Sequence, residues 1–293
     1  MRILITGMTG FLGRHLAPEL CRRGHHVGGV VRGGSHLPAV LADIPTWLVG
    51  PDYAGVAEAL ETFKPDVTVH LAGLFVAEHQ PKDVLPLVRA NIEFGACLLD
   101  AMRESGCGAL VYAGTSWQHY RDQEYCPVNL YAATKQAFST LAEYYVDAAG
   151  LRLLELHLYD SYGEVDERNK LINLLKRSAE SADELVMSGG EQRLHMVHVD
   201  DLARGFAMAC EQVVTWPAGS RQVYRLPSAQ AISLKELVAA FVAIDPSRPV
   251  RVRWGGRPYR AREVFQPWES GTILPGWQSE ITLLEGLRRV RRS

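Results

Sequence analysis

The chain begins with a short apolar strand, Arg2-Ile3-Leu4-Ile5-Thr6, that runs directly into the turn Gly7-Met8-Thr9-Gly10-Phe11-Leu12-Gly13. In such a turn the first glycine permits the tight bend, the second lets the backbone approach a pyrophosphate, and the third allows close helix–strand packing. The helix that follows would present its positive end to the phosphates. The GxxGxxG spacing therefore predicts a dinucleotide-binding turn. We expect contacts with the cofactor from Gly7, Thr9, Gly10, Phe11, Leu12 and Gly13.

The pattern that follows this turn predicts the fold class. Apolar runs recur at residues 26–31, 46–49, 67–72, 109–114 and 151–158, and helical patterns lie near 11–23, 53–63, 84–105 and 130–149. Continuous apolar strands that alternate with helices indicate a parallel sheet covered on both faces. We therefore predict an α/β fold with a doubly wound, Rossmann-type parallel sheet.

After about residue 160 the alternation loosens, which suggests a second structural unit. Helical patterns lie near 168–181, 200–213 and 233–243, short strand candidates lie at 184–187 and 222–226, and Gly and Pro are dense from 245 to 277. Such punctuation is typical of loops. We expect an NADP-binding Rossmann domain at 1–160 and a smaller C-terminal α/β substrate lobe at 161–293. Some segments, about 195–225, should return to the first domain.

Composition and charge exclude several classes of protein. Lys plus Arg number 31 against 33 Asp plus Glu, so no broad positive field is available to attract nucleic acid. No apolar run reaches the roughly 18 residues of a membrane-spanning helix. The five cysteines are scattered without nearby histidines at zinc spacing, which argues against a metal site. We expect a cytoplasmic protein with no nucleic-acid or membrane partner.

The end of the second predicted strand bears on the choice of cofactor. An NAD-preferring site usually places a carboxylate there to bind the ribose 2′-hydroxyl, whereas this chain reads Val30-Val31-Arg32-Gly33. A guanidinium suits a 2′-phosphate. NADP(H) is therefore favoured over NAD(H), with Arg32 as the main determinant. The alternative is that Arg32 only ends a surface strand.

Tyr131 and Lys135 form a candidate proton-transfer pair. Their i, i+4 spacing places them on one face of a predicted helix. A free phenol, with a pKa near 10, is a weak acid–base group at neutral pH, and a nearby cation lowers that pKa. Thr115 and Ser116 end the preceding predicted strand, where a hydroxyl could polarise a substrate carbonyl. The alternative role for these hydroxyls is to cap the end of the strand.

Taken together, these groups resemble the extended short-chain dehydrogenase/reductase family of NAD(P)-dependent nucleotide-sugar epimerases, dehydratases and reductases. Further matches occur in order at His70-Leu71-Ala72-Gly73, Asn91-x-x-x-Gly95, Tyr162-Gly163, His198-Val199-Asp200-Asp201 and Pro275-Gly276-Trp277. The resemblance covers nearly the whole chain. It also implies a possible homodimer through the helices near 84–105 and 130–149.

The resemblance implies roles for residues at matching positions. Thr115, with Ser116 as the alternative, would orient the sugar oxygen, Tyr131 would be the acid–base group, and Lys135 would lower its pKa and hold the nicotinamide ribose. Further cofactor contacts are expected from Asp52 toward the adenine, from Leu71, Ala72 and Gly73 on the ribose side, and from Asn91. Lys170 and Arg193 are candidate substrate-binding cations, as are Arg260 and Arg262.

Departures from the family pattern narrow the reaction. Family 4,6-dehydratases carry an Asp-Glu pair after the Thr, where this chain has Ser116-Trp117. Related 3,5-epimerase-reductases carry a Cys at the position of Trp117. Dehydration and 3,5-epimerisation are therefore disfavoured. Reduction of a ketone and 4-epimerisation remain.

Arg32 favours reduction, because reductases usually consume NADPH whereas epimerases retain NAD. The chain also looks like the nucleotide-sugar 4-ketoreductases of the CDP-abequose synthase type. We therefore expect an NADPH-dependent enzyme that reduces the 4-keto group of a nucleotide-activated 6-deoxyhexose. The alternatives are a nucleotide-sugar 4-epimerase with tightly bound NAD and a non-catalytic NADP-sensing regulator. The sequence does not identify the nucleobase.

Overall fold

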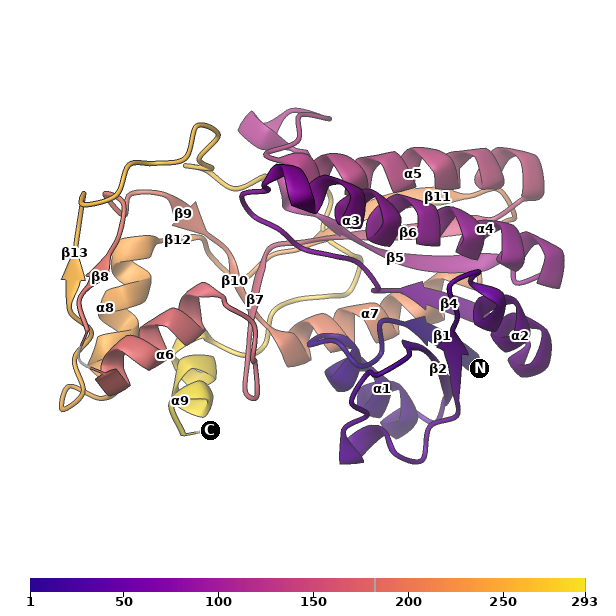
Figure 1. Ribbon diagram of the computed structural model, residues 1–293, viewed down its shortest axis with the longest axis horizontal. Coiled ribbons are helices and arrows are strands. Elements are labelled where there is room, and N and C mark those ends of the chain that lie inside the picture. The colour runs from indigo at the N-terminus through magenta and orange to yellow at the C-terminus, as the bar shows by residue number, and fades with distance from the viewer. Residues whose placement is uncertain (182, 293) are drawn as a thin grey trace.

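A computed structural model describes residues 1–181 and 183–292. Within these residues a seven-stranded parallel sheet has the order β11-β6-β5-β4-β1-β2-β3 (Figure 1). Ile5 of β1 pairs with Gly29 of β2 on one side and with Val69 of β4 on the other. The strands are β1 (Arg2–Thr6), β2 (His26–Arg32), β3 (Thr46–Val49), β4 (Val67–His70), β5 (Ala109–Thr115), β6 (Arg152–Leu158) and β11 (Arg221–Leu226).

Helices cover both faces of this sheet, as predicted. Successive side chains of β1 point to opposite faces of the sheet, so Ile3 and Ile5 belong to one apolar cluster and Leu4 to the other. The first cluster includes α1 (Gly13–Arg22) and α7 (Val199–Val213), and the second includes α2 (Ala54–Phe63), α4 (Phe94–Ser105) and α5 (Leu130–Ala149). The fold is therefore the doubly wound α/β architecture of the Rossmann type.

The helix expected over 84–105 is interrupted. It consists of α3 (Val84–Val88), the π-helical turn η3 (Arg89–Glu93) and α4. Asn91 lies buried in this turn, where its Oδ1 accepts from Leu74 N (2.7 Å) and its Nδ2 donates to Thr134 Oγ1 (2.9 Å). The π-helical turn therefore points the Asn91 side chain inward, where it fixes the loop after β4. The spacing of apolar residues does not predict such a turn. The short 3-10 helices are η1 (Ala39–Leu41), η2 (Pro81–Asp83), η4 (Ser116–Gln118) and η5 (Tyr120–Asp122).

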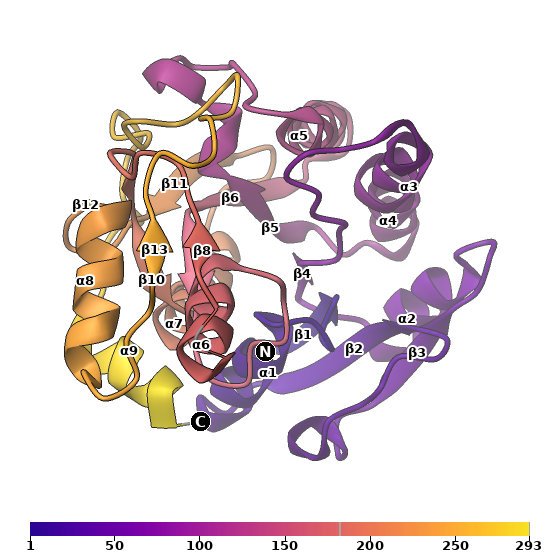
Figure 2. The same ribbon diagram turned by 60° about the vertical axis from the view of Figure 1, so that its left-hand side comes forward.

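A smaller lobe packs beside the carboxyl ends of the sheet strands (Figure 2). Its helices are α6 (Leu171–Ser181), α8 (Leu234–Ile244) and α9 (Leu283–Arg292). They share an apolar core that contains Leu175, Leu237, Phe241 and Leu287. Short strand pairs complete the lobe: β7 (Asp160–Tyr162) with β10 (Met196–His198), β8 (Leu185–Val186) with β13 (Val252–Arg253), and β9 (Arg193–Leu194) with β12 (Ile232–Ser233).

Asp201 of α7 ties the C-terminal segment to the sheet domain. Its side chain is fully buried, and Oδ2 accepts from Ser279 Oγ and Ile281 N, both at 3.0 Å. The Trp277 indole donates to the Asp201 carbonyl (3.1 Å). These bonds give a structural reason for two of the motifs noted in the sequence, His198–Asp201 and Pro275–Trp277.

The helices described here include none that is long and apolar enough to cross a membrane.

Candidate active site

A large cavity opens at the carboxyl ends of β1 and β4. These strands are neighbours in the sheet but not in sequence, so the chain leaves them in opposite directions and opens a crevice there. The cavity measures about 780 Å³. Twelve of the residues predicted from the sequence line it: Gly7, Gly10, Phe11, Leu12, Gly13, Leu71, Gly73, Thr115, Ser116, Tyr131, Lys135 and Lys170.

The glycine turn has the geometry that a diphosphate requires. Gly7 has a φ of +76°, and a Cβ there would lie 2.7 Å from Ala72 N, so only glycine fits. A Cβ on Gly13 would lie 2.4 Å from the Gly7 carbonyl oxygen. The backbone N–H groups of Phe11 and Leu12 have no acceptor among the described residues and lie at the start of α1. The turn therefore fits the diphosphate of a dinucleotide.

Helix α5 carries Tyr131 and Lys135 into the cavity wall. Its first turn is fixed by Asn129, whose Oδ1 accepts from Ala132 N (2.9 Å) and whose Nδ2 donates to the Ala77 carbonyl (2.9 Å). The Tyr131 ring meets Phe75 edge to face at 4.9 Å. The predicted pair therefore lines one cavity, beside the loop that follows β4.

Burial dominates the electrostatics of this pair. Lys135 is 4% exposed, and its ammonium nitrogen lies 4.5 Å from the centre of the Tyr112 ring. Desolvation lowers the Lys135 pKa to about 7, against the opposing charge of Glu155. The sequence predicts a lowering of the Tyr131 pKa by Lys135, but burial raises this pKa above its ordinary value, and the cation that opposes the rise is Arg168 instead of Lys135.

Thr115 and Ser116 differ in what their hydroxyls face. Thr115 caps η4, because its Oγ1 accepts from Trp117 N (3.3 Å), and its own N–H donates to Gln118 Oε1 (2.9 Å). Thr115 lines only this large cavity, whereas Ser116 also lines a second, smaller cavity. Of the two, Ser116, the alternative in the sequence-based prediction, is therefore the residue that faces both cavities.

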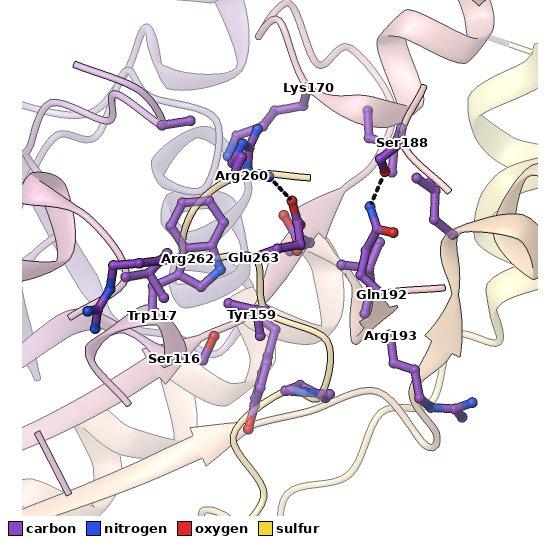
Figure 3. Close-up of a pocket in the computed structure, with 18 of the residues that line it drawn as sticks. Ser116, Trp117, Tyr159, Lys170, Ser188, Gln192, Arg193, Arg260, Arg262 and Glu263 are labelled. Carbon is purple, nitrogen blue, oxygen red and sulfur yellow. Dashed lines mark hydrogen bonds between the residues drawn. The ribbon is translucent and has the colours of Figure 1, made fainter. Parts of the chain in front are cut away.

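The second cavity, of about 310 Å³, lies between the end of β5 and the lobe (Figure 3). It shares a wall with the first through Phe75, Ala77, Ser116, Trp117, Tyr159, Asp160, Asn169 and Lys170. Its remaining lining comes mainly from the lobe and from residues 257–268. The two cavities therefore adjoin each other at these eight residues.

The candidate substrate cations are placed differently from one another. Lys170 lies at the junction, its Nζ 3.4 Å from the centre of the Phe75 ring, and burial lowers its pKa while Asp160 opposes this. Arg193 lines the smaller cavity, but its guanidinium points away from it and donates to the Ala231 carbonyl (Figure 3). Arg260 pairs with Glu78 at 2.7 Å. Of Lys170 and Arg193, only Lys170 therefore presents its charge to the junction.

Five predicted cofactor residues lie outside the cavity lining. Arg32 is exposed at the end of β2, and Asp52 is exposed with its Oδ1 accepting from Ala54 N (3.2 Å) at the start of α2. Asn91 lies behind the wall and binds the Leu74 backbone, while Ala72 packs under the glycine turn. The Thr9 carbonyl accepts from Arg14 (3.3 Å). Direct contact of these five with a cofactor stays a prediction.

A buried polar chain runs behind the site from α5 to the smaller cavity. Glu155 of β6 accepts from Ser139 Oγ (2.6 Å) and Arg221 Nε (2.9 Å), and its Oε2 lies 3.4 Å from His157 Nε2. The chain continues from His157 Nδ1 to His119 Nε2 (2.8 Å), and the His119 ring stacks on Trp268 at 3.8 Å. Burial by itself raises the Glu155 pKa, but the hydrogen bonds and opposite charges of these partners outweigh burial and lower the pKa to about 2. His119 lines the smaller cavity, so the chain links that wall to α5.

Two arginines in the cavity wall were missed by sequence reasoning. Arg14 follows Gly13 and lines the cavity, and its buried Nε has no hydrogen-bond partner among the described residues. Arg168 lies 3.9 Å from the centre of the Phe11 ring and pairs with Asp166. Arg14 could have been found because it adjoins the glycine turn. Arg168 stands in a charged loop without any such signal.

The Rossmann sheet, the glycine turn and the Tyr131–Lys135 pair together define an extended short-chain dehydrogenase/reductase. The chain belongs to the NAD dependent epimerase/dehydratase family, whose model matches residues 3–223. The residues lining the cavity fit the NAD(P) that this family binds.

Curated relatives cover most of the chain. CDP-abequose synthase from Yersinia pseudotuberculosis is 24% identical over 270 residues, which is 91% of this chain and 92% of the relative. UDP-glucose 4-epimerase from Corynebacterium glutamicum is 26% identical over 262 residues, 81% of this chain and 78% of the relative. Among solved structures, the UDP-glucose 4-epimerase of Thermus thermophilus in complex with NAD has a TM-score of 0.84 at 21% identity. The match covers 100% of this chain and 98% of that one.

Proposed function

We propose that the protein reduces the 4-keto group of a nucleotide-activated 6-deoxyhexose with NADPH. The observation that carries the proposal is the junction of the two cavities, where Ser116 and Lys170 line both and Tyr131 lines the larger. A substrate that fills the smaller cavity would bring its sugar to this junction, next to a cofactor in the larger one. The likeness to CDP-abequose synthases, which stand among the curated relatives, supports the same class of substrate.

The chain's own residues would act on the C4 oxygen of the sugar. A bound reduced nicotinamide supplies the hydride. The Tyr131 phenol donates its proton to the C4 oxygen, and the Ser116 hydroxyl, or alternatively that of Thr115, donates a hydrogen bond to the same oxygen. Lys135 would hold the nicotinamide ribose.

The preference for NADPH rests on Arg32 and on what is missing beside it. Arg32 stands exposed at the end of β2, with Gly33 and Gly34 after it and no carboxylate to accept from a ribose 2′-hydroxyl. A guanidinium there is free to bind a 2′-phosphate bidentately.

A nucleotide-sugar 4-epimerase with retained NAD is the second candidate. It is favoured by the epimerases among the relatives and by solved structures of such enzymes with NAD. An epimerase would copurify with its cofactor and consume no NADPH.

The deciding experiment measures NADPH consumption by the purified protein with CDP-, dTDP-, UDP- and GDP-linked 4-keto-6-deoxyhexoses. Turnover with one of them, and NMR evidence of a new hydroxyl at C4, is the expected result. The CDP-linked substrate is the first to test, because CDP-abequose synthases stand among the relatives. If none of the four substrates causes NADPH consumption although the protein binds NADPH, the reductase proposal is overturned.

A further inference from the structure

The wall of the smaller cavity contains a hydrogen-bond acceptor without a donor. Gln192 is 8% exposed and lines this cavity, and its Nε2 donates to Ser188 Oγ (3.1 Å). Its Oε1 is buried and has no partner among the described residues. Leaving a buried acceptor unpaired is costly, so such an atom in a ligand cavity fits a donor that the ligand brings.

The backbone on both sides of this amide is fixed. The Gln192 carbonyl accepts from Leu234 N (3.0 Å), and the next residue, Arg193, donates its N–H to the Phe265 carbonyl (3.0 Å). With the backbone held and Nε2 engaged by Ser188, the group left for a ligand is the carbonyl oxygen of the amide. The position therefore selects a ligand atom that carries a hydrogen.

Gln192 and the reacting end of the site lie apart. Figure 3 shows Ser188 and Gln192 on the opposite side of the cavity from Ser116 and Trp117. If the sugar of a nucleoside diphosphate sugar lies near Ser116, the extended molecule places its base at the other end. Leu185, Met187 and Leu234 line the cavity as well and supply apolar surface for the flat faces of a base.

The pyrimidine bases differ at one position that an acceptor can read. Cytosine carries an exocyclic amino group where uracil and thymine carry a carbonyl oxygen. A free Oε1 would accept from the amino group and would oppose the lone pairs of the carbonyl. We propose that Gln192, oriented by Ser188, selects a cytidine diphosphate-linked substrate by accepting a hydrogen bond from the cytosine amino group. This inference rests on the proposed function for the orientation of the substrate.

The test measures the affinities of CDP, UDP and dTDP by calorimetry, with the full chain saturated with NADP. We expect the unaltered protein to bind CDP about tenfold more tightly than UDP or dTDP, a typical effect of one buried hydrogen bond. Gln192→Leu should weaken CDP binding by about tenfold and should strengthen UDP binding slightly, because the repulsion between Oε1 and the uracil carbonyl is removed. Ser188→Ala should reduce the preference for CDP over UDP, because the side-chain amide of Gln192 can then rotate.

The control is Gln222→Leu, which alters an exposed residue of β11 outside both cavities and should change none of the affinities. Equal affinity of the unaltered protein for CDP and UDP overturns the inference. Unchanged CDP binding in Gln192→Leu does so too. Because no turnover is required, a cytosine preference can hold even if the enzyme proves to be an epimerase. Failure of every nucleoside diphosphate to bind, with NADP bound, overturns both proposals.

Discussion

Burial shifts the pKa values of Tyr131 and Lys135 in opposite directions, and this bears on the direction of the reaction. The Tyr131 pKa is raised, so its phenol holds its proton, while the Lys135 pKa falls to about 7. A protonated phenol suits a step that donates a proton to an emerging alkoxide. The proposed reduction requires this protonation state.

Tyr131→Phe removes the proton donor and keeps the ring that packs on Phe75. We expect turnover to fall by at least 100-fold, the usual scale for a positioned acid, while NADPH affinity stays within about twofold. Steady-state kinetics and fluorescence titration of NADPH measure the two effects. A variant with full activity would contradict the mechanism.

Arg32 and Arg14 offer a matched pair for the cofactor preference. Arg32→Ala should weaken NADPH binding by about tenfold and leave NADH binding nearly unchanged, because only NADPH carries the 2′-phosphate. Arg14 lies at the glycine turn, so Arg14→Ala should weaken both cofactors equally. Titrations with both cofactors decide this. An unchanged NADPH preference in Arg32→Ala would overturn the assignment of Arg32.

The roles of the Thr115 and Ser116 hydroxyls can be distinguished by the effect of removing each one on turnover and on stability. Ser116→Ala should lower kcat by about 100-fold or more, as expected for the loss of a hydrogen bond to the reacting oxygen. Thr115→Val removes the cap of η4, so it should lower the free energy of unfolding by about 1 kcal/mol. Kinetics and urea unfolding on both variants test this. The reverse pattern would return the role to Thr115.

At the scale of elements, the site depends on how α5 is fixed to β5 and β6. The carbonyl of Lys135 accepts from Tyr112 of β5 (3.3 Å), and Ser139, one turn further along α5, donates to Glu155 of β6. These bonds hold the helix against the sheet from behind the cavity. The buried ion pair of Glu155 with Arg221 of β11 extends this anchoring across the edge of the sheet.

Glu155 should make stability depend on pH in acid. Its pKa is about 2 in the folded protein against an ordinary value of 4.5, so its contribution is complete above pH 5 and lost as pH falls toward 2. Glu155→Gln should therefore be about 3 kcal/mol less stable than the parent at pH 7, with a gap that closes below pH 4.5. Urea unfolding across pH 3–7 measures it.

The control for this prediction is Glu143→Gln, which removes the exposed partner of the same arginine. An exposed ion pair contributes little, so this variant should stay within about 1 kcal/mol of the parent at every pH. A gap of equal size in both variants, or one that does not change with pH, would contradict the role given to Glu155.

The positions of many helices and strands could be predicted from the sequence. The apolar runs placed β1, β3 and α5 at their observed positions, because continuous burial leaves a clear pattern. Of the short strands of the lobe, β8 falls within the candidate at 184–187. The others escaped prediction, because two- or three-residue strands such as β9 are set by their partners and not by local pattern. Within β6, Glu155 and His157 lie in a strand predicted from its apolar pattern. Only the structure supplies Ser139 and His119 as the partners that allow their burial.

At the scale of the whole molecule, apolar side chains remain exposed on the outer helices. Leu85 of α3 is 64% exposed, and Leu141 and Tyr144 of α5 are 37% and 65% exposed. Figure 1 shows α3, α4 and α5 along the same side of the sheet. We propose that this face forms a homodimer interface, in line with the expectation from the sequence.

Tyr144→Glu places a charge in the middle of that proposed interface. Since a buried unpaired charge strongly opposes association, the variant should be a monomer where the parent is a dimer. Light scattering at several concentrations measures the mass, and NADPH affinity checks the fold. A monomeric parent protein would contradict the proposal outright.

The position of the candidate site could be predicted only in part from the sequence. The glycine turn predicted the sheet domain, but no local signal predicts that the guanidinium of Arg193 turns away to Ala231, because that depends on the packing of the lobe. The site lies where segments distant in sequence meet, such as Ser116 and Gln192. Their proximity across one cavity follows from the fold and not from spacing along the chain.

The position of β11 at the edge of the sheet has a consequence for biosynthesis. It pairs with β6 from Arg221 with Leu153 to Leu226 with Leu158, which leaves only the first residue of β6 outside the register. A nascent chain that has emerged only as far as residue 160 therefore displays β6 as an uncovered apolar edge, which invites association with other chains. The ribosome must add more than sixty further residues before that edge is closed. The sheet therefore cannot be completed until residues 161–226 have been made. The time between the synthesis of β6 and that of β11 is the stage at which a chaperone would be most needed.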